Sequence, residues 1–243
     1  MCGYRNTDVP LFYDEELLNK GVKKYVNWDW EAYPHLLTGG ATGSGKTYAN
    51  SIIAARVSKH ENAVLYIIDM KSQDYAFARG SKNLYEYNDA YKGLETCYED
   101  FISKLEGHNH DTTFTLIIIE ELSSLLGILQ KKEKEKAINM ISQLVFLGRS
   151  KNTHLLISSQ RPDSNMFGAG VRDSLNAVLW VGGGLSPQVK KMIADGFEDK
   201  LYMGKSRGQG FFILNSFHIY DIIVPKVQDM TKLQNYIIEA LNR

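Results

Sequence analysis

The sequence lacks several features that identify other classes of protein. It has only two cysteines in 243 residues, Cys2 and Cys97, which give no disulfide framework and no metal-ligand spacing and fit a reducing compartment. Its longest apolar run, around residues 116–119, is far shorter than the roughly 20 residues of a membrane span. No basic-then-apolar leader opens the chain. We therefore expect a cytoplasmic protein without a membrane segment.

An excess of one charge and a flexible linker are also missing. Lys plus Arg equal Asp plus Glu at 28 each, so the formal net charge is zero. Proteins that coat nucleic acid usually carry a basic excess, so any contact with DNA has to be local, through a few loops or a pore. The sequence has only 5 prolines and no Pro-, Gly- or Ser-rich stretch between halves, which favours one large α/β domain over two small ones.

Short apolar runs alternate with longer amphipathic stretches along the chain. Four runs rich in β-branched residues predict buried strands at residues 34–38, 63–68, 114–119 and 153–158. The intervening stretches predict helices at residues 47–59, 90–106 and 134–147. This alternation favours an α/β fold, a mostly parallel, doubly wound sheet flanked by helices.

The last third of the chain continues this pattern and then changes. A strand is predicted at residues 177–181, a helix at 186–194 and a β-hairpin at 210–214 and 220–224. Asn215 and Ser216 lie near the hairpin turn, and a closing helix with a Thr231 cap is expected at residues 231–241.

The first 33 residues are predicted to be an N-terminal extension that packs on a core domain of residues 34–243. Trp28, Trp30 and Tyr33 lie just before the first core strand and are interpreted as packing residues. The alternative is that one of them stacks on an adenine, since aromatic faces serve either purpose.

A glycine-rich segment satisfies the pattern G-x-x-x-x-G-K-[ST] in full. It consists of Gly40, Ala41, Thr42, Gly43, Ser44, Gly45, Lys46 and Thr47, and it joins a predicted strand to a predicted helix. In this context backbone N–H groups and the helix dipole bind phosphates, Lys46 reaches the β- and γ-phosphates, and the Thr47 hydroxyl holds Mg²⁺. A glycine-rich turn that binds nothing is the alternative. The segment predicts an ATP and Mg²⁺ site.

Two acids, Glu120 and Glu121, follow the apolar strand predicted at residues 114–119. A phosphate loop needs a second carboxylate near the metal at the end of another buried strand, so Glu120 is predicted to face Mg²⁺ and Glu121 to polarise the attacking water. The usual first acid is aspartate, one methylene shorter, which leaves the metal geometry open. The alternative is that both acids stabilise a helix N-terminus.

Further polar residues flank the strand predicted at residues 153–158. Gln160 follows it and is either a contact of the γ-phosphate or an ordinary loop glutamine. Arg149 and Arg161 are candidates for an arginine finger from a neighbouring subunit, against the commoner fate of a surface salt bridge. The mixed charges at residues 131–136 predict a solvated helix start, with a DNA-facing pore loop as the alternative.

These motifs occur together in an order that resembles the FtsK/SpoIIIE family of DNA-pumping ATPases, within the wider group of HerA-like motors and conjugative coupling proteins. The resemblance rests on G-A-T-G-S-G-K-T, on I-D-M-K at residues 68–71, on I-I-I-E-E, and on G-R-S followed by H-L-L-I-S-S-Q-R-P. The glycine-rich segment at residues 201–212 also looks like the hairpin that follows the family's core. The resemblance covers roughly residues 34–226.

The resemblance implies a RecA-like P-loop core in a hexameric ring around double-stranded DNA, with ATP bound between subunits. Lys46, Thr47, Glu120, Glu121 and Gln160 match the family's nucleotide residues. Arg149 matches the family's arginine before the H-L-L-I strand and is favoured as the residue that acts in trans, with Arg161 and Arg207 left open. Asp69 and Lys71 match a D-x-K motif and are expected to be structural or near the subunit interface.

The chain departs from large family members because it shows no anchor, no long linker and little room for a DNA-reading module. The leading hypothesis is therefore a bare ATP-driven DNA translocase, recruited by a relaxase or replication protein and suited to a mobile element, phage or plasmid. The alternative is an assembly, recruitment or secretion-type ATPase that DNA does not stimulate. A small-molecule kinase is a distant third hypothesis.

Overall fold

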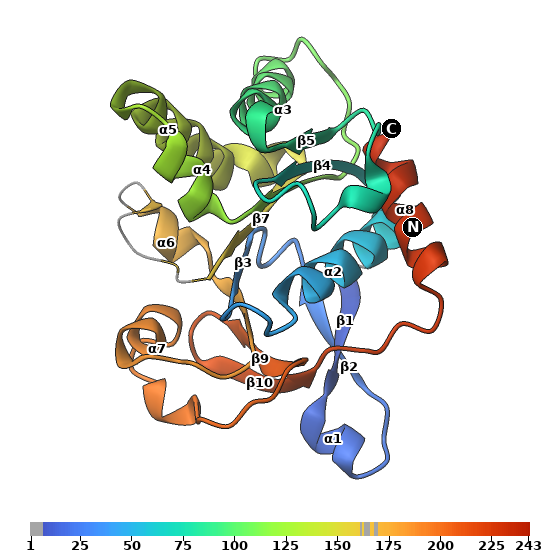
Figure 1. Cartoon of the computed structure of the whole chain (residues 1–243), viewed down its shortest axis with the longest axis vertical. Coiled ribbons are helices and arrows are strands. Elements are labelled where there is room, and N and C mark those ends of the chain that lie inside the picture. Colours follow the sequence, from blue (N-terminus) through green and yellow to red (C-terminus); the bar gives the residue numbers. More distant parts are fainter. Residues whose placement is uncertain (1–6, 161, 163–165, 168–169) are drawn as a thin grey trace, which may run out of the picture.

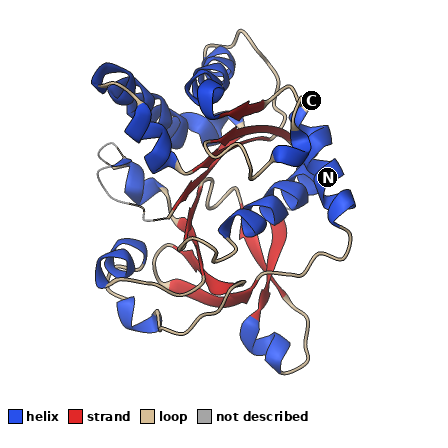
Figure 2. Ribbon diagram, viewed as in Figure 1, coloured by secondary structure: helices blue, strands red, loops and turns tan. Residues whose placement is uncertain are grey.

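The computed structural model describes residues 7–160, 162, 166–167 and 170–243, and their strands form one ten-stranded sheet in the order β2-β1-β10-β9-β8-β3-β7-β6-β4-β5. The strands are β1 (Asp8–Asp14), β2 (Tyr25–Asp29), β3 (Leu36–Gly39), β4 (Val64–Asp69), β5 (Leu84–Glu86), β6 (Thr115–Glu120), β7 (Thr153–Ser159), β8 (Ala177–Val181), β9 (Gln209–Leu214) and β10 (His218–Ile223). Figure 2 shows this sheet running through the molecule with helices on both sides.

Helices cover the two faces of the sheet in separate groups (Figure 1). The α-helices are α1 (Glu15–Asn19), α2 (Lys46–Glu61), α3 (Ala90–Leu105), α4 (Leu122–Ile128), α5 (Lys131–Leu147), α6 (Val171–Ser174), α7 (Pro187–Ile193) and α8 (Met230–Leu241). Buried residues of α2 and α8 share one core cluster, whereas those of α3, α4, α5 and α7 belong to a second cluster. The mostly parallel α/β fold predicted from the sequence is confirmed.

The six strands from β8 to β5 in the sheet order are parallel. Every residue of β3, β6 and β7 is buried, which is what their unbroken apolar runs require in a sheet covered on both faces. The carboxyl ends of the parallel strands β3, β4, β6 and β7 therefore meet along one side of the sheet, at Gly39, Asp69, Glu120 and Ser159. We call this side the carboxyl edge and the opposite side the amino edge.

The other four strands, β2, β1, β10 and β9, are joined by antiparallel pairing. The predicted hairpin forms with a three-residue turn, residues 215–217, in which Asn215 and Ser216 have positive φ. The sequence predicts that residues 1–33 form an extension that packs on the core domain. In the structure their described part supplies two further strands of the same sheet. A domain boundary after residue 33 remains a prediction.

Three helix starts show how local sequence sets the element boundaries. Helix α5 begins at Lys131 with a capping box between Gln130 and Glu133. Residues 131–136 are exposed, which agrees with the prediction of a solvated helix start. The hydroxyl of Ser186 accepts from the Val189 N–H to cap α7. The predicted Thr231 cap is wrong: the Asp229 side chain caps α8, because its carboxylate accepts from the Lys232 N–H.

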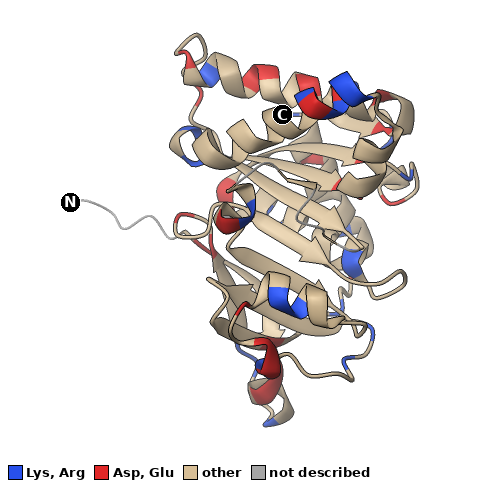
Figure 3. Ribbon diagram, turned by 90° about the vertical axis from the view of Figure 1, so that its left-hand side faces the viewer, with Lys and Arg blue, Asp and Glu red and all other residues tan. Residues whose placement is uncertain are grey.

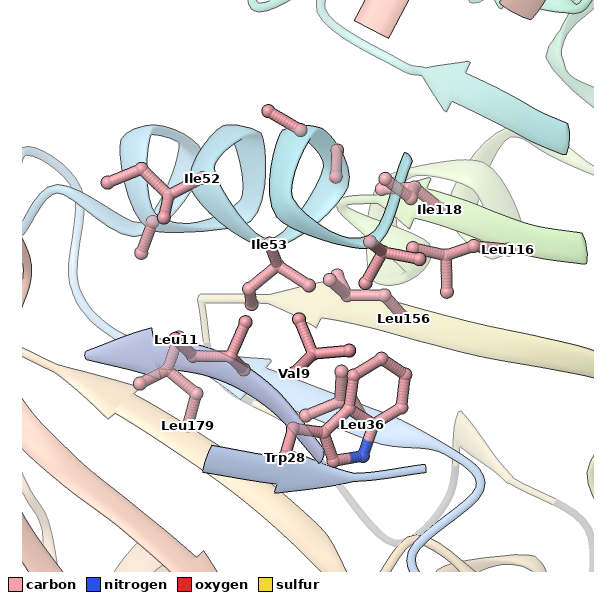
Figure 4. Close-up of a cluster of buried hydrophobic side chains, with 14 of the residues drawn as sticks. Val9, Leu11, Trp28, Leu36, Ile52, Ile53, Leu116, Ile118, Leu156 and Leu179 are labelled. Carbon is pink, nitrogen blue, oxygen red and sulfur yellow. The ribbon is translucent and has the colours of Figure 1, made fainter. Parts of the chain in front are cut away.

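The core on the α2 face joins the N-terminal strands to the parallel sheet. Figure 4 shows Ile53 of α2 above Val9 and Leu11 of β1, beside Leu116 and Leu156 of the central strands. Trp28 and Trp30 are buried and meet Phe114 and His154 edge to face. Their rings are enclosed in protein, which supports packing over adenine stacking.

Candidate functional site

The glycine-rich segment forms the loop between the carboxyl end of β3 and the start of α2. Gly40 has φ 148°, and a Cβ there would lie 2.4 Å from the carbonyl oxygen of Val181, so only glycine fits. Gly45 has φ 101° immediately before Lys46, the first residue of α2. These glycines turn the chain sharply enough for the amino end of a long helix to face the loop, the arrangement that binds phosphate.

Lys46 and Glu121 form a buried ion pair at this edge. The Lys46 ammonium lies 2.6 Å from Glu121 Oε1, and both side chains are almost completely buried. Glu121 connects β6 to α4 and has φ 57°, a left-handed conformation that non-glycine residues rarely adopt. Such backbone strain persists where surrounding structure holds it and is concentrated at functional sites. The two predicted catalytic residues are thus in direct contact.

Glu120 lies beside this pair and is held by two donors. Its Oε1 accepts a hydrogen bond of 2.9 Å from Asn50 Nδ2 and one of 3.2 Å from the Tyr75 hydroxyl. Burial raises the pKa of Glu120 above its usual range, although its hydrogen bonds oppose that shift. Glu120 Oε2 is buried without a hydrogen-bond partner.

The residues predicted to hold Mg²⁺ fit that ion. A hard cation prefers carboxylate and hydroxyl oxygens and keeps several waters, so one carboxylate and one hydroxyl are enough from the protein. Glu120 provides an unpaired carboxylate oxygen, and Thr47 is the second residue of α2. Among the described residues no group of three or more His, Cys, Asp or Glu is placed to hold a metal by itself, so substrate phosphates would complete the shell.

Lys71 also belongs to the site, beyond the role expected from the sequence. Its ammonium lies 3.6 Å from Glu121 Oε1 and 3.7 Å from Asp74 Oδ2. Partial burial lowers the pKa of Lys71, but the neighbouring acids outweigh it and leave the pKa above its usual value. Asp69 is structural, because its carboxylate accepts from the backbone N–H groups of Lys71 and Tyr75.

Gln160 is brought to the phosphate loop from the neighbouring strand. The Thr42 hydroxyl donates to Gln160 Oε1 at 2.9 Å, so Gln160 lies where it can contact a terminal phosphate. Arg207 lies near the other end of the same loop, since a Cβ at Gly45 would be 3.8 Å from Arg207 Cγ. Arg161 lies outside the described residues.

Arg149 is separated from these residues by the length of one strand, β7. It is an exposed residue of the 3₁₀ turn Gly148–Lys151, which precedes β7, whereas Gln160 follows that strand. Seven strand residues span roughly 20 Å. Arg149 therefore lies at the amino edge, where it lines a cavity of 470 Å³ with Lys151 and Trp30.

Sequence patterns missed two residues that the structure brings into the site, Asn50 and Tyr75, and they gave Lys71 a structural or interface role instead. Asn50 lies one turn after Lys46 on α2, so helical spacing marked it as a neighbour of the loop. Lys71 follows β4, whose Asp69 pairs in register with Glu120. Its position just after a neighbouring strand at the same carboxyl edge was therefore a signal that it lies near Glu121. Tyr75 reaches Glu120 through an irregular segment, for which the sequence gives no spacing rule.

Comparisons with known proteins identify relatives of this chain. A sequence profile described as "Helicase HerA, central domain" matches residues 16–175, more than half of the chain. The FtsK domain-containing protein YdcQ of Bacillus subtilis is 27% identical over 250 residues, which cover 93% of this chain and 51% of YdcQ. A DNA translocase FtsK of Tropheryma whipplei is 28% identical over 167 residues, covering 55% of this chain and 22% of that protein. The chain spans about half the length of YdcQ.

Solved structures share the fold. The conjugation coupling protein TcpA of pCW3, in monomer form with ATPγS, matches with a TM-score of 0.71 and 17% identity, over 91% of this chain and 66% of TcpA. The cytoplasmic domain of the type VII secretion ATPase EccC of Thermomonospora curvata matches with a TM-score of 0.70 and 17% identity, over 98% of this chain and 31% of EccC. The profile match identifies this chain as a member of the HerA helicase central-domain family, among the FtsK/HerA-type P-loop ATPases.

Proposed function

We propose that this chain is the motor domain of an ATP-dependent DNA translocase that binds and hydrolyses ATP between subunits to move duplex DNA. One observation supports it above the others: Lys46, Glu121 and Glu120 meet beside the glycine-rich loop, while Arg149 lies on the opposite edge of the sheet. This division suits a site that two chains complete.

The residues of one chain divide the chemistry of hydrolysis among them. Residues 40–47 bind the phosphates, and Lys46 exchanges its contact with Glu121 for the β- and γ-phosphates. Glu121, released from Lys46, orients the attacking water as a general base. Thr47 and Glu120 would hold Mg²⁺, which when bound would supply positive charge against the phosphate oxygens. Gln160 contacts the γ-phosphate end.

The remaining charge comes from a second copy of the chain. An arginine at the amino edge cannot reach its own glycine-rich loop across roughly 20 Å of strand. A contact between one chain's carboxyl edge and the next chain's amino edge is heterologous. Repeated contacts of this kind form a ring when the rotation between neighbouring chains closes. We therefore assign the trans role to Arg149 in a hexameric ring, because Arg207 lies against its own loop.

Duplex DNA is the proposed polymer, through local contacts. The chain has no net charge, and in the view of Figure 3 positive and negative segments are interspersed over the helices. DNA handling is suggested by the names of the FtsK translocases and the coupling protein that this chain resembles.

A relaxase or replication protein of a mobile element, phage or plasmid is the proposed recruiter, in the cytoplasm. Among the described helices, none has the length and apolar character to cross a membrane.

A second candidate function is a recruitment or secretion-type ATPase that DNA does not stimulate. It is favoured by the match to EccC over 98% of this chain and by the zero net charge. It differs from the translocase in one measurable respect, since its hydrolysis depends on a protein partner and ignores DNA.

Steady-state ATP hydrolysis with and without linear duplex DNA tests the proposal. Lys46→Ala serves as the blank, because it removes the ammonium that contacts the phosphates. Stimulation by duplex DNA that is lost in Lys46→Ala supports the translocase. Lys46-dependent hydrolysis that no DNA changes supports the recruitment ATPase, and a rate that survives in Lys46→Ala contradicts both.

A further inference from the structure

The segment that follows β4 reaches both acids of the candidate site. It consists of residues 70–75, between β4 and the 3₁₀ turn Ala76–Ala78, and we call it the β4 loop. The Tyr75 hydroxyl donates to Glu120 Oε1 at 3.2 Å, and the Lys71 ammonium lies 3.6 Å from Glu121 Oε1. One loop therefore contacts the two residues to which metal binding and water activation are assigned.

The β4 loop is held in place by hydrogen bonds that involve neither acid. The Asp69 carboxylate accepts from the backbone N–H groups of Lys71 at 3.0 Å and of Tyr75 at 3.1 Å. Ser72 has φ 54°, a left-handed conformation, and the Arg79 guanidinium donates to its carbonyl oxygen. The backbone of Lys71 is therefore fixed independently of the ion pairs in the site.

Glu121 has two ammonium groups beside the same oxygen. Lys46 lies 2.6 Å from Glu121 Oε1 and Lys71 lies 3.6 Å from it. Among the described residues, these two lysines are its ion-pair partners. The Glu121 side chain is only 3% exposed, and a carboxylate buried to this extent is costly without a partner.

Nucleotide binding removes the first of these partners. In the proposed function, Lys46 leaves Glu121 for the β- and γ-phosphates. The Lys71 side chain is 41% exposed, so packing does not confine it. Its distance from Glu121 exceeds the roughly 2.7–2.9 Å of a charge-assisted hydrogen bond by less than about 1 Å. A small movement of Lys71 therefore replaces the partner that Glu121 loses.

Asp74 keeps Lys71 close to the site before that movement. Asp74 Oδ2 lies 3.7 Å from the Lys71 ammonium, and it is buried without a hydrogen-bond partner. The ammonium is thus held between two acids, within reach of Glu121, while Lys46 still occupies that carboxylate.

We propose that Lys71 is a positioning residue that takes over Glu121 when Lys46 moves to the phosphates of ATP, and that it then holds Glu121 for its work on the attacking water. The inference rests on the proposed function, since it needs ATP on residues 40–47 and Glu121 as the general base. It adds a lysine from outside the glycine-rich segment, which acts through Glu121 rather than on the phosphates.

Lys71→Met tests this role, because it removes the ammonium and keeps most of the apolar stem. Calorimetry with Mg²⁺ and the non-hydrolysable analogue AMP-PNP measures the Kd, and steady-state ATP turnover measures kcat. We expect the Kd to rise about tenfold, because Glu121 lacks a partner only in the bound state. We expect kcat to fall about tenfold, less than the loss of about 10²–10⁴-fold for removal of the base itself. Lys71→Arg, which still pairs with a carboxylate, is expected to stay within about threefold of the wild type.

The same substitution in a Glu121→Gln protein separates action through Glu121 from direct action on the phosphates. With residue 121 uncharged, Lys71→Met is expected to change the Kd and kcat by less than about twofold, because the two residues act as one pair. An effect as large as in the wild-type background would place Lys71 on the phosphates and overturn the proposal.

Lys92→Met is the matched control. Lys92 is an exposed lysine in the first turn of α3, the helix after β5, which pairs with β4. It is expected to leave the Kd and kcat unchanged. If the Kd is also unchanged in Lys71→Met, or if only the thermal stability of the free protein falls, the role of Lys71 fails and the proposed function stands. If the wild-type protein does not bind the analogue, the proposed function fails, and the role of Lys71 fails with it.

Discussion

The two edges of the parallel sheet differ in how they hold charge. At the carboxyl edge, Lys46 and Glu121 are paired and almost fully buried. At the amino edge, Arg149 is exposed beside a 470 Å³ cavity. The buried titratable groups there include His35, His154 and Lys104, whose ammonium lies 3.4 Å from Asp100. A buried charge is costly without a partner, whereas an exposed arginine is not. In the proposed function, the first edge binds ATP within one chain and the exposed Arg149 of the second meets a neighbouring chain.

This difference follows from the geometry of parallel strands. All carboxyl ends meet on one side of the sheet, and open α/β sheets bind their ligands there. A residue at the other end serves such a site only in a neighbouring chain. The variants below test whether the two edges depend on each other, beginning with the largest expected effect.

Arg149→Ala is expected to have the largest effect on hydrolysis. Loss of a trans arginine removes charge from the transition state and lowers kcat by about 10³–10⁵-fold, whereas the Kd for ATP stays near that of the wild type. Turnover assays and calorimetry on the same preparation measure both. Lys151→Ala, on the same turn and the same cavity, is the control and is expected to remain active. A full rate in Arg149→Ala would remove the amino edge from the mechanism.

Glu121→Gln separates binding from hydrolysis at the carboxyl edge. Loss of a general base lowers kcat by about 10²–10⁴-fold. ATP is expected to bind at least as tightly as to the wild type, because Lys46 no longer has to break an ion pair with residue 121 before it contacts the phosphates. Glu106→Gln, an exposed acid far from the loop, is the control. Weaker ATP binding together with an unchanged kcat would show that Glu121 has only a structural role.

Asn50→Ala tests how Glu120 is oriented. Asn50 Nδ2 donates to Glu120 Oε1 at 2.9 Å, and groups that orient a metal-binding carboxylate are usually worth about 10–100-fold in metal affinity. The Mg²⁺ concentration for half-maximal hydrolysis is expected to rise by that factor. Asn62→Ala, at the far end of α2, is the control. An unchanged Mg²⁺ requirement would contradict the assignment of Glu120 to the metal.

Acid is expected to weaken the amino edge through its histidines. Burial lowers the pKa of His35 to about 4 and that of His154 to about 3, against about 6.5 in an unfolded chain. Between these values the unfolded state binds more protons than the folded state, so stability is present above about 6.5 and is lost as the pH falls. Each histidine contributes up to about 1.4 kcal/mol per pH unit.

Urea unfolding at pH 7, 6 and 5 measures this dependence. His154→Gln removes one titrating group and is expected to flatten the slope of unfolding free energy against pH. The exposed His218→Gln is expected to leave the slope as it is. Equal slopes in the wild type and His154→Gln would mean that His154 is not buried in its neutral form.

The sequence predicted the parallel half of the fold well because its signals are local. Unbroken apolar runs predicted β4, β6 and β7 within one or two residues, and the glycine pattern located the phosphate loop. The sequence leaves Gln160 open between a γ-phosphate contact and an ordinary loop glutamine; in the structure it accepts a hydrogen bond from Thr42 of the phosphate loop. The hairpin was predicted from two short apolar runs with Asn215 and Ser216 between them, and both residues have positive φ in the turn that forms.

The sequence did not predict contacts that depend on distant pairing. Strand β1 enters the sheet by pairing with β10, about 200 residues away, and loop closure over such a distance leaves no local pattern. The contact of Lys71 with Glu121 depends on the register in which β4 pairs with β6, which the sequence does not give. The Thr231 cap was wrong because Asp229, two residues earlier, is a better acceptor at that position.

The most direct test of a site shared between two edges is to mix two inactive variants. Lys46→Ala disables the carboxyl edge and Arg149→Ala the amino edge, so each alone is inactive. In a co-expressed equal mixture, about a quarter of the heterologous contacts join an intact loop to an intact arginine. We predict that the mixture recovers ATP hydrolysis at about a quarter of the wild-type rate. A mixture that stays as inactive as its components would contradict a site completed by two chains.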